Sequence, residues 1–426
     1  MFKSFIQKKL ESLVKLYFTN HPEVKLIVVT GSVGKTSAKL AIATILSEKF
    51  KVRVHEGNHN TFLSAPLAIL GVEYPKNIRN IFEWLAVFRA AKKRIKSPSD
   101  VDFIIQELGS DRIGQVPHFG TYLKPDIAVV TAISAEHMEY FKTIDTVAKE
   151  ELSVSDYSKL TFINREDIDG KYAEYITSPD IQTYGTTVSA EYNFLVEDYS
   201  AQDGYSGTMS LLELNESFKV NIKLIGEHTL RPIVVASAIG AKFGMTKDEI
   251  ISGIKNVRAV PGRMNLLKGI KDSVIIDDTY NSSPLAAQSA IRELYKLDAA
   301  SKVAVLGSMN ELGVTSQVEH EELGKMCDPN QLVWVVTVGK DANNYLAPAA
   351  KTRGCQVRSF MSAIEAGGFV NSIIEPGMAI LFKGSQGDIY LEEAVKVILH
   401  NSKDESQLVR QSEKWMKIKN KFFSKF

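Results

Sequence analysis

The sequence has few of the features that mark extracellular, membrane-spanning or nucleic-acid-binding proteins. It contains only two cysteines, Cys327 and Cys355, without CxxC spacing, so neither a disulfide framework nor a cysteine-rich zinc site is expected. No run of about 18 apolar residues occurs, and the lysine-rich N-terminus does not fit a signal peptide. The 51 Lys and Arg residues balance 50 Asp and Glu, which leaves no excess positive charge for nucleic acid. We therefore expect a cytoplasmic protein with reduced thiols that binds no nucleic acid.

Both ends of the chain are basic and amphipathic. Between Phe2 and Phe18, apolar residues fall mostly on one face of a helix, with lysines between them. The segment from Lys414 to Phe426 also combines lysines with aromatic residues. Two interpretations stay open for each end. We favour a terminal helix packed on its own domain, and the alternative is a weak contact with an anionic membrane surface.

The hydrophobic pattern divides the chain into two α/β blocks. A chain of 426 residues is too long for one ordinary core. Buried strands are expected at the apolar, β-branched runs 25–30, 101–106 and 127–131 in the first block, and at 273–276, 302–306, 332–338 and 378–382 in the second. Between about 158 and 223, short alternating runs suggest a small antiparallel section. The predicted units are an N-terminal helical segment (1–24), a central domain (25–257), a C-terminal domain (258–400) and a basic helical tail (401–426).

A glycine-rich turn follows the first expected strand and precedes a helical pattern. Glycines in residues 30–37 (TGSVGKTS) would let backbone N–H groups approach phosphate oxygens, and the N-terminus of a helix favours an anion. Lys35 is expected to reach the outer phosphates, and the hydroxyl of Thr36 or Ser37 to bind Mg²⁺. Val29 replaces the first glycine of the common GxxxxGK[ST] pattern, so a chance turn is the alternative to a nucleotide site. The residues expected to contact the nucleotide are Gly31, Ser32, Gly34, Lys35, Thr36 and Ser37.

Further motifs follow in a fixed order along the chain. They are Gly57-Asn58-His59-Asn60-Thr61, Glu107-Leu108-Gly109, Lys124-Pro125-Asp126, Thr131 through His137, Gly226-Glu227-His228, Pro261-Gly262-Arg263-Met264, Asp277 through Pro284, Gly307 through Gly313, and Lys383-Gly384-Ser385. With the glycine-rich turn, this series resembles the Mur ligase family over roughly residues 25–390. It is most similar to the members that add D-alanyl-D-alanine.

The resemblance implies both a fold and an activity. The fold would be α/β, with a P-loop central domain built on a parallel sheet plus a small antiparallel section, followed by a Rossmann-like C-terminal domain. The activity would be that of an ATP-dependent, ADP-forming ligase that uses Mg²⁺. Such a ligase activates a carboxylate as an acyl phosphate and joins it to the amine of an amino acid or dipeptide, here in the synthesis of cell-wall peptide precursors. The sequence does not indicate an oligomeric state.

The start of the chain differs from that of the peptidoglycan ligases. Those enzymes carry a UDP-sugar-binding domain before the phosphate loop, whereas about two dozen residues precede the first expected strand here. We therefore expect that a nucleotide-sugar substrate is not held in the usual way, and the alternatives are another carboxylate, a lipid-linked or shorter muramoyl peptide, or a partner protein.

The chemistry requires cations, because an anionic carboxylate must approach the anionic γ-phosphate. Glu107, at the end of an expected strand, is predicted to bind Mg²⁺ with Thr36 as a hard oxygen ligand. By resemblance, His137 would serve a second metal site, and Arg263 would contact the nucleotide phosphates across an interdomain cleft. An exposed acid at the end of the strand and a structural histidine are the alternatives for Glu107 and His137.

One position departs from the family pattern at the metal site. In these ligases a lysine fourteen residues after the histidine is usually carbamylated and helps to hold metal. Here that position is Glu151, and we expect it to supply a carboxylate directly. Lys149 is the competing candidate, and both residues could instead be solvated charges on a helix face.

The resemblance implies roles for several other residues. Asp278 would lie near the ribose, and Tyr280 and Asn281 would form a turn that faces the nucleotide, although Asn281 could equally be a turn residue before a helix. The residues expected on the substrate side are Asn60, Thr61, His320 and Lys383. Two departures are Thr229, where the family has Asn, and Ser308, where it has Asp.

Other functions remain open at this point. A nucleotide-binding partner or regulatory module could keep the fold without ligase chemistry. A ligase similar to folylpolyglutamate synthetase would use a substrate unrelated to the cell wall. A P-loop kinase or GTPase would leave the C-terminal motifs unexplained.

Overall fold

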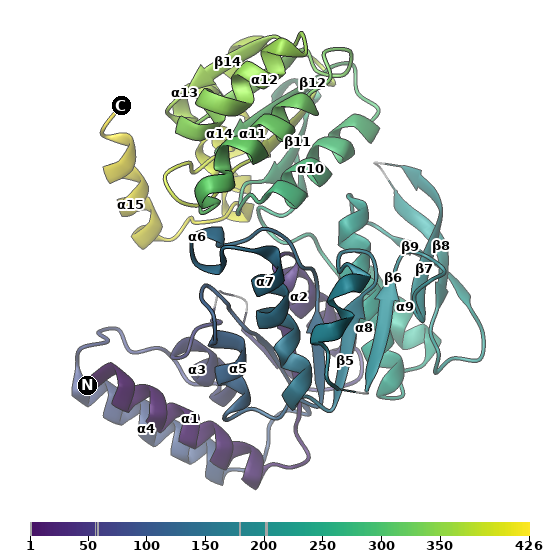
Figure 1. Ribbon diagram of the computed structural model, residues 1–426, viewed down its shortest axis with the longest axis vertical. Coiled ribbons are helices and arrows are strands. Elements are labelled where there is room, and N and C mark those ends of the chain that lie inside the picture. Colours follow the sequence, from purple (N-terminus) through teal and green to yellow (C-terminus); the bar gives the residue numbers. More distant parts are fainter. Residues whose placement is uncertain (1, 56, 58, 179, 201–202) are drawn as a thin grey trace.

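A computed structural model of the protein describes residues 2–55, 57, 59–178, 180–200 and 203–426. Asn58, part of the predicted asparagine-containing loop, lies outside the described residues. The chain forms two α/β units, each built on its own sheet, with the second unit above the first in Figure 1.

The first unit contains a nine-stranded sheet in the order β2-β3-β1-β4-β5-β6-β7-β8-β9. Its parallel part comprises β1 (Lys25–Thr30), β2 (Val52–Val54), β3 (Phe103–Glu107), β4 (Ile127–Val130), β5 (Leu160–Asn164) and β6 (Ile181–Gly185). The central strand β1 lies between β3 and β4, and its β-branched residues are buried from both faces. The carboxyl ends of these strands therefore meet at one edge of the sheet.

The antiparallel section is smaller than the sequence suggests. Strands β5 and β6, within the range predicted to be antiparallel, instead extend the parallel sheet. Only β7 (Tyr192–Ser200), β8 (Gly204–Ser210) and β9 (Phe218–Ile222) pair antiparallel. Both kinds of strand can alternate apolar and polar residues when one face is partly solvated, so the alternation could not separate them.

Helices cover both faces of the first sheet. One face carries α1 (Phe2–Asn20), α3 (Ser64–Leu70), α4 (Ile81–Lys96), α5 (Gln115–Gly120) and α7 (Ile144–Leu152), and the other carries α2 (Lys35–Leu46), α8 (Leu230–Lys242) and α9 (Lys247–Asn256). The short helix α6 (Met138–Phe141) precedes α7. A capping box between Thr246 and Glu249 fixes the start of α9, the last helix before the second unit.

The second unit contains a six-stranded sheet in the order β10-β11-β15-β12-β13-β14. Its strands are β10 (Asn265–Lys268), β11 (Val274–Asp278), β12 (Lys302–Gly307), β13 (Trp334–Val338), β14 (Val357–Phe360) and β15 (Ala379–Lys383), and only β10 is antiparallel to its neighbour. One face is covered by α10 (Pro284–Lys296), α11 (Ser316–Lys325) and α12 (Ala347–Thr352), and the other by α13 (Ala363–Ile373) and α14 (Glu392–Ile398).

The terminal segments both pack on the adjoining unit. Helix α1 buries Ile6, Leu10, Leu13, Val14 and Tyr17 in the first core. Near the other end, α15 (Glu413–Phe423) inserts Lys419, which is buried beside Glu392 of α14. These five residues of α1 are thus internal, whereas Phe2 and Phe5 at the start of the helix are exposed. None of the helices in the described part of the chain has the length and apolar character needed to cross a bilayer.

Candidate functional site at the junction of the two units

The phosphate loop lies between β1 and α2 at the carboxyl edge of the first sheet. Gly31 and Gly34 have φ angles of 119° and 88°, a region that glycine adopts without strain. A Cβ atom on Gly31 would lie 2.4 Å from Thr131 Oγ1, so the loop approaches β4 too closely for any side chain here. The loop therefore presents its backbone N–H groups at the start of α2, as a phosphate site requires.

The Lys35 ammonium is surrounded by oxygen atoms. It donates to the Gly31 carbonyl and lies 3.6 Å from Glu136 Oε2. Burial lowers the pKa of Lys35, but the carboxylates of Glu136, Glu151 and Glu107 outweigh burial, so the pKa lies above its usual value. Lys35 is thus a stable cation that fits the outer phosphates of a nucleotide.

Glu107 lies at the carboxyl end of β3 and is 3% exposed. Thr36 Oγ1 donates to its Oε2 over 3.0 Å, and Asn60 Nδ2 donates to its Oε1 over 3.2 Å. Lys39, one turn after Lys35 on α2, places Nζ 3.6 Å from Glu107 Oε2. The loop, β3 and the asparagine segment therefore meet at one carboxylate.

The oxygen atoms of Thr36 and Glu107 suit a magnesium ion. Mg²⁺ usually takes one or two protein oxygens and completes its coordination with phosphate oxygens and water. Within the described residues, no group of three or more His, Cys, Asp and Glu side chains is arranged to hold a metal by itself. The donor set thus fits a metal that binds together with a nucleotide.

His137 meets carboxylates from both units. Its Nδ1 lies 2.6 Å from Glu311 Oε2 of the second unit, while its Nε2 lies 3.4 Å from Asp111 Oδ1 and 3.6 Å from Glu136 Oε1. Burial lowers the pKa of His137, but these three carboxylates raise it above the usual value. A ring held by a carboxylate on one nitrogen is oriented to present the other nitrogen.

The two candidates on α7 point in different directions. Glu151 is 2% exposed, and its Oε2 accepts hydrogen bonds from the Gly31 N–H at 2.7 Å and from the Thr30 hydroxyl. Burial raises the pKa of Glu151, although Lys35 opposes this. Lys149 is exposed, with Nζ 4.9 Å from the centre of the Tyr175 ring. Glu151 thus contacts the phosphate loop from behind, and its role with metal stays a prediction.

Arg263 connects the second unit to the phosphate loop. It follows Gly262, which has φ of 68°, and its Nη2 donates to Thr36 Oγ1 over 3.4 Å. The guanidinium lies 4.2 Å from the centre of the Tyr280 ring. Its buried Nε has no partner among the described residues. A buried guanidinium N–H with no acceptor, next to Thr36, fits an incoming anion such as a phosphate.

The turn after β11 is tied down by several buried contacts. Asp278 Oδ2 lies 2.8 Å from Lys383 Nζ, which also donates to the Asn281 carbonyl over 2.7 Å. Arg410, from the C-terminal segment, donates to the carbonyls of Thr279 at 2.6 Å and Tyr280 at 2.9 Å. Lys383 therefore holds the turn after β11 in place, and its contact with substrate stays a prediction.

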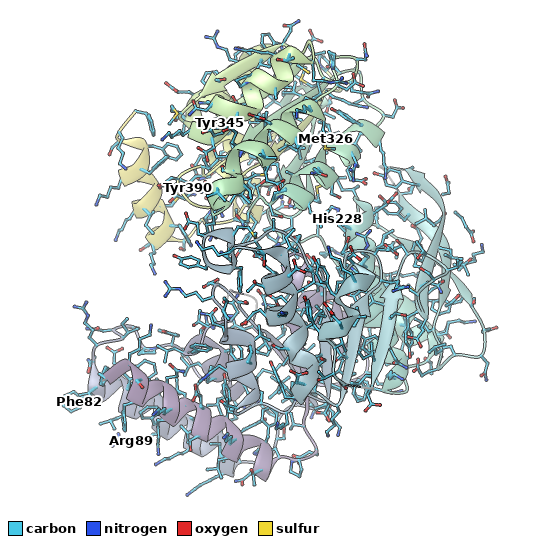
Figure 2. The ribbon with its side chains drawn as sticks, viewed as in Figure 1. Phe82, Arg89, His228, Met326, Tyr345 and Tyr390 are labelled. Carbon is cyan, nitrogen blue, oxygen red and sulfur yellow. The ribbon has the colours of Figure 1, made fainter. Side chains whose placement is uncertain are left out.

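His228 lies where the two units meet (Figure 2). It follows Gly226, and its Nδ1 lies 3.0 Å from Ser289 Oγ on α10 of the second unit. Burial lowers the pKa of His228 to about 4, so the ring is neutral at pH 7. Nearby, Lys296 of α10 lies 2.7 Å from Glu227. These contacts join the two units next to the cavity.

Most of the predicted residues line one cavity of about 570 Å³ between the two units. The predicted residues on its wall are Ser32, Gly34, Lys35, Thr36, Ser37, Asn60, Glu107, His137, Arg263, Asp278, Tyr280, Asn281 and Lys383. Gly31 belongs to the loop but is not on the cavity wall, and Glu151 accepts a hydrogen bond from its N–H on the side away from the cavity.

Two predicted substrate residues are not on the cavity wall. His320 is fully buried, its Nε2 accepts from the Met309 N–H at 2.9 Å, and its Nδ1 lies 2.7 Å from the Ser316 carbonyl. The buried His320 ring thus holds the backbone of the 307–313 loop and does not line the cavity. This corrects the expectation that His320 faces a substrate. Thr61 makes a hydrogen bond to Ser64 at the start of α3, at 2.8 Å between the two hydroxyls.

Three residues of the site were not anticipated from the sequence. Glu136 and Glu311 both contact His137, and Arg410 braces the turn after β11. Glu136 stands next to His137 in the sequence, and that adjacency was the available signal. Glu311 lies within the quoted motif from Gly307 through Gly313, where no role was assigned to it, and Arg410 lies outside every quoted motif.

Comparisons with known proteins agree with this geometry. The family model described as the Mur ligase middle domain matches residues 29–240, and the one described as the Mur ligase glutamate ligase domain matches residues 262–386. The UDP-N-acetylmuramoyl-tripeptide--D-alanyl-D-alanine ligase of Bacillus subtilis is 27% identical over 402 residues, which cover 92% of this chain and 79% of that enzyme. The Escherichia coli enzyme of the same name is 24% identical, over 75% of this chain and 65% of its own length.

Solved structures give the same fold. MurF from Acinetobacter baumannii superposes with a TM-score of 0.75 at 22% identity, covering 91% of this chain and 79% of that one. MurF from Thermotoga maritima, solved in complex with ADP, has a TM-score of 0.73 at 22% identity and covers 94% of this chain and 84% of its own.

Proposed function

Because this chain belongs to the Mur ligase family, we propose that it is an ATP-dependent, ADP-forming ligase of the D-alanyl-D-alanine-adding type. Its carboxylate substrate would be a UDP-N-acetylmuramoyl-tripeptide, and its amine substrate the dipeptide D-alanyl-D-alanine. The reaction would take place in the cytoplasm, in the synthesis of peptidoglycan precursors.

The observation that carries the proposal is the meeting of cations and carboxylates from two units. Lys35 and Glu107 come from the first unit, and Arg263 of the second reaches Thr36 within 3.4 Å. A P-loop kinase or GTPase does not require such a second unit. A ligase does, because it must hold a nucleotide, a carboxylate and an amine together.

The reaction would proceed in two steps. In the first step, a carboxylate oxygen attacks the γ-phosphorus of ATP, and the bond between that phosphorus and the β,γ-bridging oxygen breaks. ADP departs, and the substrate carries an acyl phosphate. The amine then attacks the acyl carbon, phosphate leaves, and the amine nitrogen loses a proton. Lys35 and Arg263 would hold the phosphates and offset the negative charge that the first step brings together.

Magnesium would bind to Thr36 and Glu107 and supply further positive charge to the phosphate oxygens. We propose His137 and Glu151 for the second metal site. A glutamate there would provide the carboxylate that the family usually obtains from a carbamylated lysine. On the substrate side we retain Asn60, which also orients Glu107, and Lys383.

The direct test uses the purified full-length chain with ATP, Mg²⁺ and UDP-N-acetylmuramoyl-tripeptide. We expect release of ADP that depends on D-alanyl-D-alanine, together with a product whose mass equals the sum of the two substrates less water. Hydroxylamine should trap the acyl phosphate when the amine is omitted. A Lys35→Ala variant serves as the inactive control. Multiple-turnover release of ADP that requires neither D-alanyl-D-alanine nor hydroxylamine would refute the assignment.

A further inference from the structure

Helices α1 and α4 form a two-helix layer at the edge of the first unit that lies away from the second unit (Figure 1). Asn20 Nδ2 donates to the Ile95 carbonyl over 3.3 Å, and His21 Nε2 lies 3.1 Å from the same oxygen. The carboxyl ends of the two helices therefore meet. Both helices start on the same side, so residues near Phe5 and Phe82 lie at the same end of the layer.

The inner faces of the two helices are fully used in the core. Trp84, Val87, Phe88, Ala91 and Ile95 of α4 are buried against α1 and the sheet. The outer faces nevertheless carry large apolar side chains at the shared N-terminal end. The exposed fractions are 76% for Phe82, 60% for Phe5, 54% for Ile78, 44% for Leu85, 42% for Ile81 and 41% for Phe2.

Such a concentration is not explained by folding. Single exposed apolar residues are common, but a contiguous group on one surface marks an interaction site. We call these six residues, Phe2, Phe5, Ile78, Ile81, Phe82 and Leu85, the apolar tip. Figure 2 shows Phe82 at the outer edge of the molecule, with Arg89 further along the same helix.

Basic residues surround the apolar tip and continue along both helices. Residues 1–20 and 76–96 contain eleven Lys and Arg but only two Glu, a net charge of +9 in a chain whose net charge is +1. Along α4 the exposed residues are first apolar and then basic: Phe82 and Leu85, followed by Arg89, Lys92, Lys93 and Lys96. This spacing keeps the apolar and basic groups on one outward face.

The two glutamates in these segments make local contacts. Glu11 lies 2.7 Å from His118 Nε2, and Glu83 accepts a hydrogen bond from the Asn77 N–H at 2.9 Å, before α4. They therefore do not cancel the positive charge of the outward lysines. The remainder of the chain carries a net charge of −8, so the positive charge is concentrated here.

We propose that this layer docks the protein on an anionic membrane surface, with the apolar tip entering the interface and the basic stripe contacting lipid phosphates. Peripheral helices bind membranes by combining aromatic and aliphatic insertion with attraction to anionic lipids. A protein partner would need an acidic surface with an apolar pocket, whereas an anionic bilayer offers both properties over its whole area. The proposal is independent of the ligase assignment.

The position of the layer leaves the cleft accessible. The second unit lies at one end of the first unit, and α1 and α4 lie at the opposite end (Figure 1). Docking would therefore not obstruct the junction of the two units at His228, and ligase activity should not require vesicles. The proposed membrane contact and the proposed ligase site therefore lie on different parts of the molecule.

The test is co-flotation of the full-length chain with lipid vesicles. We expect binding to phosphatidylcholine vesicles that contain roughly one third phosphatidylglycerol, weak binding to phosphatidylcholine alone, and loss of binding as salt increases. Lys92→Glu with Lys93→Glu should weaken partitioning at least about thirtyfold. Phe5→Ser with Phe82→Ser should weaken it at least about tenfold.

Matched controls come from surfaces outside the layer. Leu212→Ser removes another apolar side chain, 56% exposed, and Lys351→Glu with Lys403→Glu reverses two other exposed charges. These variants should bind as the wild type does, and all variants should keep the wild-type melting temperature. Equal binding to both kinds of vesicle, or equal loss in the control variants, would overturn the proposal. So would sedimentation showing that the apolar tip instead mediates dimers that do not bind vesicles.

Discussion

Arg410 offers a measurable link between the C-terminal segment and the turn after β11, which we propose faces the nucleotide. Its guanidinium pairs with Glu392 at 2.8 and 2.7 Å and also donates to the carbonyls of Thr279 and Tyr280. The Arg410 side chain is 4% exposed and that of Glu392 is fully buried. Arg410→Met would leave Glu392 with one cation, Lys419, and two carbonyls without their donor.

The structure sets the size of the expected effect. Removing one partner of a buried ion pair costs about 3–5 kcal/mol. Because Lys419 Nζ still lies 3.4 Å from Glu392 Oε1, we expect the lower end of that range, about 3 kcal/mol. In a domain of this size, such a loss lowers the melting temperature by about 6–12 °C. The turn would also lose its brace, so KM for ATP should rise about fivefold.

The assay must separate stability from positioning. Differential scanning calorimetry measures the transition of the second unit, and steady-state kinetics measure KM for ATP. The double variant Arg410→Gln with Glu392→Gln removes both charges, so most of the stability should return, because no lone buried charge remains. Its KM should stay raised, because the brace on the carbonyls is still absent. A melting temperature within about 2 °C of wild type for Arg410→Met, with unchanged KM, would refute the reasoning.

Three further predictions concern the cleft. Gly31→Ala should abolish ATP-analogue binding in calorimetry, since its Cβ has no space, whereas Gly114→Ala, at a φ of 88° with open space around it, should retain binding. Glu151→Gln should lower kcat at least about a hundredfold while Lys149→Ala stays near wild type, and removal of bicarbonate should change neither; the opposite ranking would favour a carbamylated lysine. His228 has a folded pKa of about 4 against 6.5 when unfolded, so the unfolded chain binds more protons between these values. Wild-type stability should therefore fall by at most about 3 kcal/mol as pH drops from 6.5 to 4, measured by urea unfolding, and His228→Gln should show a smaller fall.

The sequence predicted those parts of the fold that depend on local pattern. The run of β-branched residues in β1 and the glycines of the phosphate loop determine local backbone geometry, so their positions could be predicted from the residues themselves. Family membership and the two-unit α/β architecture, both anticipated by motif order, are confirmed by the comparisons.

What the sequence missed depends on contacts between distant segments. Strands β5 and β6 pair parallel because of the neighbouring strand that each one meets at the edge of the sheet. The alternation of apolar and polar residues in the sequence does not encode that neighbour. The family resemblance assigned His320 to the substrate side, but a resemblance in sequence does not say which way a side chain points. The buried bonds of His320 to Met309 and Ser316 became visible only in three dimensions.

The contact between His137 and Glu311 would tie the affinity for the proposed second metal to the closed arrangement of the two units. Glu311 engages Nδ1 of the ring and so leaves Nε2 directed toward Glu136, where the proposed second metal would bind. A metal at Nε2 would then favour the closed arrangement, and thermodynamic reciprocity requires that closure tighten the metal by the same factor. Separation of the two units during product release would loosen the ion as well, so each catalytic cycle would renew its metal together with its nucleotide.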